Sequence, residues 1–234
     1  MHNLSNIQNK IINKFLKSKE LKYCQAKPLN IANDLYNYHL QFLKKKGFIT
    51  KTLNKYKLTD KGKVYVLRMN LTGEMSQYFK CSVLCYVLRE KDSKIKILLQ
   101  RRLRQPYFGD IGTVSGKILL GEKVENAACR KLSEETGLNG DFKFIGLIRK
   151  IRRDNNKKVI DDTLFHVCVS EIYIGKLILK NKYGENFWDN LNNAIKYQKK
   201  NITASYQTEK LLKRIKLKDF SLFYFTEDII LNNF

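Results

Sequence analysis

The sequence predicts an α+β protein of two domains, a small helical module followed by a larger domain with a mixed sheet. Three features of the chain support this. Over residues 1–70, apolar residues recur at helical spacing and then enter a hairpin-like pattern. From Phe79 onward, apolar runs of strand length alternate with turns. Residues 71–78 are polar and contain Gly73, which is typical of a linker, so the second domain is expected at residues 79–234.

Composition limits the class of protein. The chain has 234 residues, of which 43% are hydrophobic, and this is enough to bury a core. No apolar run approaches the roughly 20 residues of a membrane span, and the N-terminal segment has no signal-peptide core. The 5 cysteines are odd in number and form no CxxC pair. We expect a soluble cytoplasmic protein with reduced thiols and no membrane partner.

The charge is strongly basic. The formal net charge is +23, which permits binding of nucleic acids or nucleotides. A bland alternative is codon usage, because Lys, Asn and Ile are all abundant, as an AT-rich genome would produce. The positive charge is also spread along the chain rather than gathered in one block. The charge therefore allows a polyanionic partner without establishing one.

The N-terminal module reads as three helices. Apolar residues within residues 7–16 repeat at helical spacing. A second helix over residues 24–29 is short, because Pro28 is poorly tolerated in a helix interior. Asn33 is expected to cap a third helix, and Gly47 is a typical C-terminal stop for it. These signals predict three helices ahead of a hairpin and a final helix.

A hairpin pattern follows the third helix. Two short strands, "FITKTL" and "YKLT", are joined at Asn54, and Thr59 can cap a final helix. The string "YHLQFLKKKGFIT...YKLTDKGK" resembles the recognition helix and wing of the winged helix-turn-helix family. That resemblance implies that the third helix enters a DNA major groove. Protein docking or dimerisation stays open as the alternative use.

Several third-helix side chains are candidates for contact with double-stranded DNA. We expect them to be exposed, and they comprise Tyr36, Asn37, Gln41, Lys44 and Lys45. His39 is expected to be a half-buried packing residue, as a lone helical histidine usually is.

The C-terminal domain mixes strands with helices. Strand-like runs are "FKCSVLCYVL", "IKILLQ", "FKFIGLIRK" and "LFHVCVSEIYI", and a late helical signal is "TASYQTEKLLKRIK". Their order indicates a mainly antiparallel or mixed sheet rather than repeated βαβ units. The basic stretch "RKIRRDNNKK", residues 149–158, is interpreted as a solvated hairpin tip.

One loop and helix carry the strongest chemical signal. A helix is expected over residues 123–136, with Gly137 ending it. Its position brings together three carboxylates, those of Glu122, Glu134 and Glu135. Clustered carboxylates are hard oxygen ligands suited to Mg²⁺ or Mn²⁺. Such an ion can orient a pyrophosphate and activate the attacking water.

The same stretch, "GKILLGEKVENAACRKLSEETGL", resembles the Nudix box in spacing. The matching positions are Gly116, Glu122, Arg130, Leu132, Glu134, Glu135, Gly137 and Leu138. The resemblance implies a Nudix α/β/α sandwich that hydrolyses nucleoside diphosphate derivatives with Mg²⁺. It also implies that Glu134 and Glu135 hold the metal and act in catalysis. Arg130 is expected to pair with Glu122, which we include among the metal ligands.

Lys131 departs from the box, where the family has Glu. A protonated lysine can neither bind a metal nor act as a general base, and this one lies one helical turn from Glu134 and Glu135. The base is then sought on later loops. Candidates are Asp161, Asp162 and Glu185, of which Glu185 in "YGENFW" is preferred as a catalytic residue.

Basic side chains after the second strand are expected to shape a pocket. Arginine forks suit phosphate oxygens, although solvated surface arginines are the alternative. The proposed substrate-binding residues are Arg101, Arg102, Gly116 and Lys117. Tyr107 and Phe108 are expected either to stack on a base or to pack against the loop.

The predicted function is a Mg²⁺-dependent hydrolase that cleaves the pyrophosphate of a nucleoside diphosphate derivative and carries an appended winged helix. The alternative is a nucleotide-sensing DNA-binding regulator whose Nudix pocket is catalytically weakened. The retained Glu122, Arg130, Glu134 and Glu135 favour the hydrolase, and Lys131 favours the regulator. Both module types commonly pair, so a homodimer is an open alternative to a monomer.

Overall fold

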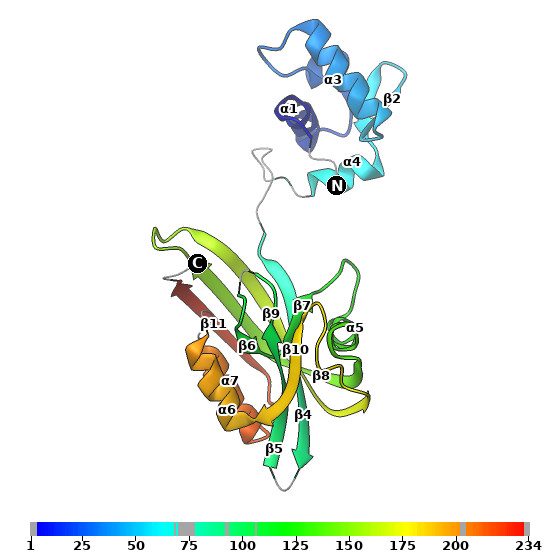
Figure 1. The fold of residues 1–234 in the computed structure, drawn as a ribbon. Helices are drawn as coiled ribbons and strands as arrows, with labels where there is room; N and C mark the ends of the chain where they lie inside the picture. The colour runs from blue at the N-terminus through cyan, green and yellow to red at the C-terminus, as the bar shows by residue number, and fades with distance from the viewer. Residues whose placement is uncertain are drawn as a thin grey trace. The chain divides into compact units, whose positions relative to one another are not determined.

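The chain separates into two units, and each is described by itself. A computed structural model describes residues 4–67, 69, 78–91, 94–105, 107–201 and 205–231. The units are Met1–Tyr78 and Phe79–Phe234, drawn in Figure 1. Of the predicted linker, residues 71–78, only Tyr78 lies within the described residues.

The N-terminal unit combines helices with a small sheet. Its elements in chain order are α1 (Asn6–Lys14), the 3₁₀ helix η1 (Phe15–Lys17), β1 (Leu21–Lys22), α2 (Tyr23–Ala26), α3 (Asn33–Lys45), β2 (Ile49–Thr52), β3 (Lys55–Leu58) and α4 (Asp60–Val66). The three strands pair antiparallel in the order β1-β3-β2. This arrangement is compatible with a winged helix. The sequence did not reveal β1, which is only two residues long.

Local signals in the sequence explain these helix boundaries. The Ser5 hydroxyl accepts a hydrogen bond from the Gln8 backbone N–H at 3.4 Å and caps α1. Thr59 caps α4 as expected, accepting from the Gly62 N–H at 3.1 Å. After α3, Gly47 adopts a φ of 74°, a conformation that favours glycine.

The C-terminal unit is built on one large mixed sheet. Its elements are β4 (Lys80–Lys91), β5 (Lys94–Arg102), β6 (Ile111–Gly112), β7 (Val114–Lys117), α5 (Val124–Thr136), β8 (Leu138–Arg153), β9 (Val159–Gly175), β10 (Gly184–Asn190), α6 (Leu191–Lys200), α7 (Tyr206–Lys216) and β11 (Phe223–Ile230). The strand order is β10-β5-β4-β9-β8-β11, with β6 paired to β5 and β7 to β4. The β4/β9 and β8/β11 pairs are parallel and the other pairs are antiparallel. The expected mixed sheet is confirmed.

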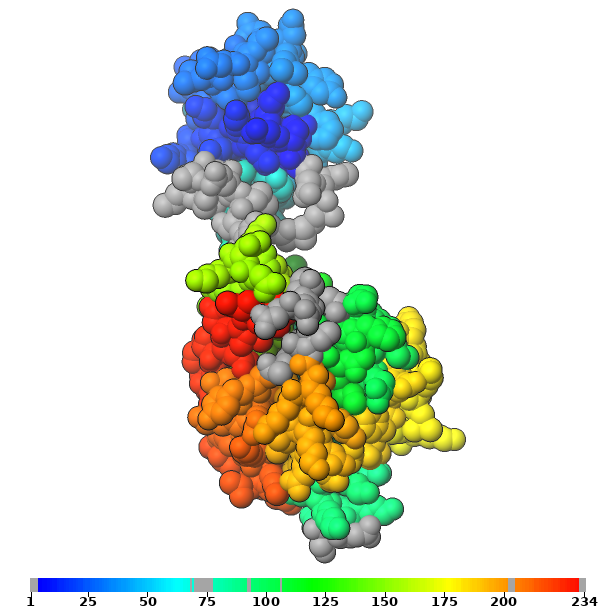
Figure 2. All heavy atoms as spheres, turned by 60° about the vertical axis from the view of Figure 1, so that its left-hand side comes forward, coloured from blue at the N-terminus to red at the C-terminus, as the bar shows by residue number. Residues whose placement is uncertain are grey.

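Helices cover both faces of this sheet. Successive residues of a strand point to opposite faces, so β4 supplies both cores. Val83 and Val87 pack with Leu132 of α5. Leu84 and Leu88 pack with the helices α6 and α7, drawn in orange in Figure 2. The predicted three-layer α/β/α sandwich is confirmed. Helix α7 was predicted, whereas the weakly apolar α6 was not.

Two expectations from composition bear on the environment of the protein. All five cysteines are free, and Cys85 and Cys168 are buried. Among the described residues, no helix is long and apolar enough to cross a membrane.

Candidate functional site

An arginine–carboxylate pair holds the loop before α5 in shape. Arg130 Nε and Nη2 donate to the two carboxylate oxygens of Glu122 at 2.7 and 2.8 Å, the pairing expected from the sequence. Glu122 also accepts from the Leu119 N–H at 2.9 Å, and Arg130 donates to the Lys117 carbonyl at 3.1 Å. The Arg130 hydrogen bonds, helped by that of Leu119, lower the pKa of Glu122 to about 2. Glu122 therefore fixes the loop.

Lys131 occupies the space between the last two box carboxylates. Its Nζ lies 2.6 Å from Glu135 Oε1 and 3.0 Å from Glu134 Oε2. The lysine side chain is only 12% exposed. Burial acts to lower the pKa of Lys131, but the hydrogen bonds to Glu135 and Glu134 outweigh it and raise the pKa above its ordinary value. The side chain is therefore a fixed, protonated cation.

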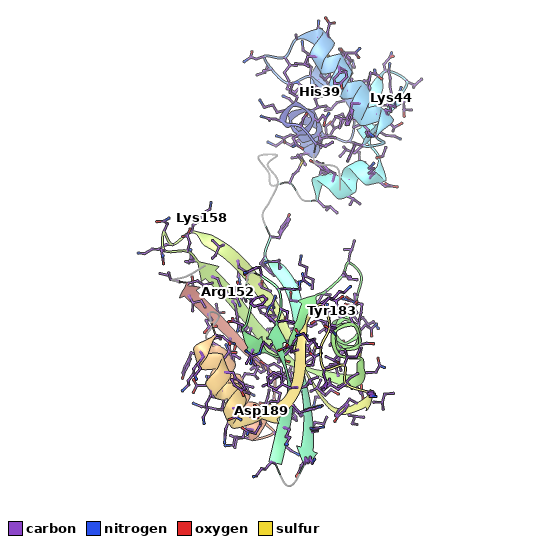
Figure 3. All side chains as sticks on the ribbon, viewed as in Figure 1. His39, Lys44, Arg152, Lys158, Tyr183 and Asp189 are labelled. Carbon is purple, nitrogen blue, oxygen red and sulfur yellow. The ribbon has the colours of Figure 1, made fainter. Side chains whose placement is uncertain are left out.

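Packing holds the lysine in this position. A Cβ atom placed on Gly116 would lie 2.2 Å from the Cε of Lys131, so only glycine leaves room for the lysine stem. The ammonium also lies 5.2 Å from the ring centroid of Tyr183, which Figure 3 labels. The first glycine of the motif thus accommodates Lys131 in this chain.

The carboxylates as arranged do not fit a divalent metal ion. Glu134 and Glu135 are both bound by Lys131, and Glu122 is bound through both oxygens by Arg130. Among the residues that the structure describes, no group of three His, Cys, Asp or Glu side chains is placed to hold a metal. A metal would have to displace a tethered ammonium that carries the same sign of charge. The metal roles of Glu122, Glu134 and Glu135 stay a prediction.

A cavity of about 660 Å³ lies beside the box. Its basic lining residues are Lys80, Arg102, Arg104, Lys117, Arg130, Lys131, Lys150 and Arg152. Its acidic lining residues are Asp110, Glu135 and Asp161. With eight cationic side chains against three carboxylates, the lining of the cavity has an excess of positive charge.

The structure brings only some of the predicted pocket residues together. Arg102, Gly116 and Lys117 line the cavity, as does Tyr107. Phe108 is exposed and is not among the lining residues.

Arg101 and Glu185 lie outside the cavity lining and contact each other instead. They face each other across the β5–β10 pair, with Arg101 Nε 3.7 Å from the Glu185 carboxylate. Lys180 binds Glu185 at 2.8 Å and is the main cause of its lowered pKa. The role of Glu185 as general base stays a prediction.

The other two candidate bases differ in position. Asp161 lines the cavity and is bound by Lys80 and Arg152. Asp162 is bound instead by Arg149 at 2.8 Å. Burial acts to raise the pKa of Asp161, but the contacts with Lys80 and Arg152 outweigh it and lower the pKa, so this carboxylate is a poor proton acceptor at neutral pH.

Sequence reasoning missed two cavity residues, Lys150 and Arg152. The interpretation of residues 149–158 as a solvated tip is wrong for these two, which are 6% and 5% exposed. Strand β8 continues through them to Arg153, so they share a face with buried Ile148. The available signal was that every second residue from Ile148 onward shares one face of the strand. The many charged residues in this stretch favoured the interpretation as a solvated tip instead.

The N-terminal candidates mostly have the expected exposure. Asn37, Gln41, Lys44 and Lys45 are exposed on α3, which Figure 3 marks at Lys44. The expectation for Tyr36 is wrong. Its ring is fully buried, and its hydroxyl donates to the Tyr23 carbonyl at 2.8 Å.

His39 is half-buried on α3, as predicted. Its Nδ1 lies 3.2 Å from the Gln8 side-chain nitrogen on α1, a contact between two packed helices. This residue therefore has a packing role.

Comparison with known proteins defines the class of the C-terminal unit. A family model described as the NUDIX domain matches residues 79–207, more than half of the chain. The chain belongs to the NUDIX family, at the level of which pyrophosphohydrolase activity and divalent metals are general features. No curated protein sequence matches the chain.

Solved structures support the same fold. The NUDIX domain of Shewanella oneidensis NrtR, complexed with ADP ribose, has a TM-score of 0.51 at 16% identity, covering 69% of this chain and 99% of its own. The mutator MutT protein of Bacillus halodurans has a TM-score of 0.50 at 16% identity, covering 63% of this chain and 91% of its own. At this identity the likeness concerns the fold.

Proposed function

We propose that the NUDIX domain binds the diphosphate of a nucleoside diphosphate derivative without a resident metal, as the sensing part of a DNA-binding regulator. One observation carries the proposal: Lys131 Nζ lies 2.6 and 3.0 Å from Glu135 and Glu134, where the family holds its cation. A covalently attached ammonium supplies positive charge beside the cavity at all times. It cannot activate a water molecule as a metal does.

The lining of the cavity supports an anionic ligand. Among its cations, Arg102 and Arg104 carry guanidinium forks that match phosphate oxygens, while Lys117 offers a point charge beside the box. ADP-ribose, which the NrtR domain binds, contains the diphosphate linkage expected here and is a suitable first probe.

The N-terminal module supports the regulatory part of the proposal. Lys44, Lys45 and Lys46 form an exposed basic end of α3, and Asn37 and Gln41 are exposed on the same helix. Such side chains suit phosphate and base contacts on double-stranded DNA. Dimerisation or protein docking is the other use of this module.

The second candidate function is a metal-dependent NUDIX hydrolase. It is favoured by the box itself, in which Arg130 and Glu122 hold the loop and Glu135 lines the cavity. In that case Lys131 must leave the carboxylates before a metal binds. Turnover of a pyrophosphate then requires added Mg²⁺ or Mn²⁺.

Calorimetry and product analysis on the full-length protein separate the two candidates. We expect ADP-ribose to bind in the presence of EDTA, and Lys131→Met to weaken that binding about tenfold through loss of a charged contact. Lys123→Met is the matched control, because Lys123 is exposed at the start of α5 and does not line the cavity. It should bind as the wild type does.

The hydrolase has a different signature. Multiple turnovers of ADP-ribose or another nucleoside diphosphate derivative with Mg²⁺ or Mn²⁺, lost in Glu135→Gln, would establish it and overturn the metal-free proposal. Binding only in the presence of a divalent metal would also contradict our proposal.

A further inference from the structure

Two basic residues at neighbouring same-face positions of β8 are buried in the wall of the NUDIX cavity. Lys150 and Arg152 are 6% and 5% exposed, and both line the cavity. Figure 3 labels Arg152 on the side of the sheet away from α5, below Lys158, and Tyr183 near α5. Basic side chains are rarely buried to this extent without partners.

Among the described residues, Lys150 has one hydrogen-bond partner and one aromatic contact, in which its Nζ lies 6.0 Å from the ring centroid of Phe165. Its Nζ donates to the Thr208 hydroxyl at 2.6 Å, but an ammonium has three donors. Glu227 is linked to this lysine only through a chain of hydrogen bonds, because the Ser205 hydroxyl is hydrogen-bonded to both Thr208 and Glu227. A neutral hydroxyl is a weak counterpart for a buried cation.

Arg152 is likewise incompletely paired. Asp161 binds its Nη1, and Lys80 competes for the same carboxylate. Its Nε is buried and has no hydrogen-bond partner among the described residues. The guanidinium also forms a hydrogen bond with the Tyr107 side chain and lies 5.2 Å from its ring centroid, and the Arg102 guanidinium lies 5.7 Å from the same centroid.

The cations not held by the box outnumber the acids. Apart from Arg130 and Lys131, the basic lining residues are Lys80, Arg102, Arg104, Lys117, Lys150 and Arg152. Apart from Glu135, the acidic lining residues are Asp110 and Asp161. Even with Glu227 added behind the wall, several positive charges are left. Lys80, Arg104 and Lys117 are exposed to water, but Lys150 and Arg152 are buried and Arg102 partly so, and the desolvation of these three is unfavourable unless an anion enters the cavity.

We propose that Lys150 and Arg152 form a second anion subsite, which binds a phosphomonoester group of the same ligand whose diphosphate lies at Lys131. The inference rests on the proposed function and narrows its ligand to a nucleoside diphosphate derivative with an additional phosphate. A phosphomonoester suits the subsite better than a carboxylate does. It carries close to two negative charges and three acceptor oxygens, matching the ammonium and guanidinium donors.

A purely structural role for the pair is the competing explanation. A purely structural role would satisfy the buried donors within the chain; the neighbouring Arg149–Asp162 and Arg153–Asp228 pairs, which are partly exposed, each form two hydrogen bonds to one carboxylate. Lys150 instead meets a hydroxyl, and Arg152 leaves a buried N–H unused in the wall of a large cavity. These features favour a binding role.

Inorganic phosphate tests the subsite directly, by calorimetry or phosphorus NMR titration of the full-length protein. We expect phosphate to bind, and Lys150→Met and Arg152→Gln each to weaken that binding about tenfold. Lys143→Met and Arg153→Gln are the matched controls on β8, because Lys143 and Arg153 do not line the cavity. Thermal unfolding confirms that every variant is folded, and folded controls should retain wild-type affinity.

Three outcomes decide the inference. Absence of phosphate binding, or equal binding by wild type, Lys150→Met and Arg152→Gln, overturns it. ADP is then titrated into phosphate-saturated protein, and simultaneous binding of both supports two subsites. If ADP displaces the phosphate, its own diphosphate occupies the Lys150–Arg152 position and the inference of an additional group is wrong.

Failure of the proposed function has a separate readout. Suppose that the wild type binds phosphate but neither ADP nor ADP-ribose, and that Lys150→Met abolishes phosphate binding. The proposed diphosphate site at Lys131 is then wrong, whereas the anion subsite at Lys150 and Arg152 is supported. If ADP binds and phosphate does not, the reverse holds.

Discussion

Lys131 Nζ lies 2.6 Å from Glu135 Oε1. The aliphatic stem of the same side chain runs along Gly116, which leaves room for it because glycine has no side chain. Two positions of one motif thus fit each other in this chain. The ammonium neutralises the carboxylates that would hold a divalent ion. A metal bound to them would lie close to the ammonium, and the repulsion between the two positive charges would be strong. Removing the contact between Lys131 and Glu135 therefore tests whether the site can bind a metal.

Replacing Lys131 by Glu should create a divalent metal site. We expect Lys131→Glu to raise Mn²⁺ affinity about tenfold or more, because it removes a repelling charge and adds a ligand. Lys131→Met, which removes only the charge, should give an intermediate affinity. Mn²⁺ titration followed by electron paramagnetic resonance measures this order. Wild-type affinity as high as that of Lys131→Glu would show that the lysine leaves the site readily.

The Glu122–Arg130 pair should make stability depend on acidity. The pKa of Glu122 falls from 4.5 to about 2 in the folded protein, mainly through its hydrogen bonds with Arg130. A lowered carboxyl pKa adds stability above pH 4.5, which is lost as the pH falls toward 2. Glu122→Gln should therefore lose less stability over this interval than the wild type. Urea unfolding at several pH values measures it, and parallel curves for the two proteins would refute the assignment.

Phosphate binding should weaken as the pH rises through about 8. Burial, with a further contribution from Arg152, lowers the pKa of Lys150 from 10.5 to about 8, while Glu227 acts in the opposite direction. The binding form of the lysine is the protonated one, which is lost above that pH. Rising pH only adds negative charge to phosphate, so a decline must come from the protein.

Titration of phosphate at pH 7 and pH 9 measures this effect. Asp161, whose pKa is lowered, stays ionised throughout this range. Burial raises the pKa of Tyr107, which therefore stays neutral as well. Lys150→Met should bind weakly at both pH values. An equally steep decline in that variant would assign the titration to another group.

The basic end of α3 should control DNA affinity if the N-terminal unit contacts DNA. Changing Lys44, Lys45 and Lys46 to Gln should weaken binding to duplex DNA. The slope of the logarithm of affinity against the logarithm of salt concentration should fall in magnitude by roughly one for each lost phosphate contact. Changing Lys10 and Lys14 of α1 to Gln provides a control for general charge. Fluorescence anisotropy at several salt concentrations measures both. Equal losses in the two sets would indicate non-specific attraction.

Much of the fold was predictable because its signals are local. The glycine at the end of α5, the Thr59 cap and the continuous apolar run of β4 are each signals within a few residues. The spacing of the box was also local, and it identified the loop and helix that carry Glu122 and Arg130. Helix α6 escaped notice because its burial depends on β5 and β6, which are distant in sequence.

The site was less predictable because its geometry is not local. Glu185 and Arg101 were placed near the chemistry by sequence, yet β10 pairs with β5 so that they contact each other. Tyr36 was expected to face DNA, but packing of α3 buries it. The direction of a side chain depends on which element covers it, and a single strand or helix does not contain that information.

The sequence by itself determined the NUDIX class, the presence of a lysine among the box glutamates and the existence of a basic chain. Only the tertiary structure decided where those charges act. It seated Lys131 between Glu134 and Glu135, and it buried Lys150 and Arg152 in the cavity wall. The physical reason is that charge acts over distance in space. Folding selects which of many lysines and arginines lose water and face one another.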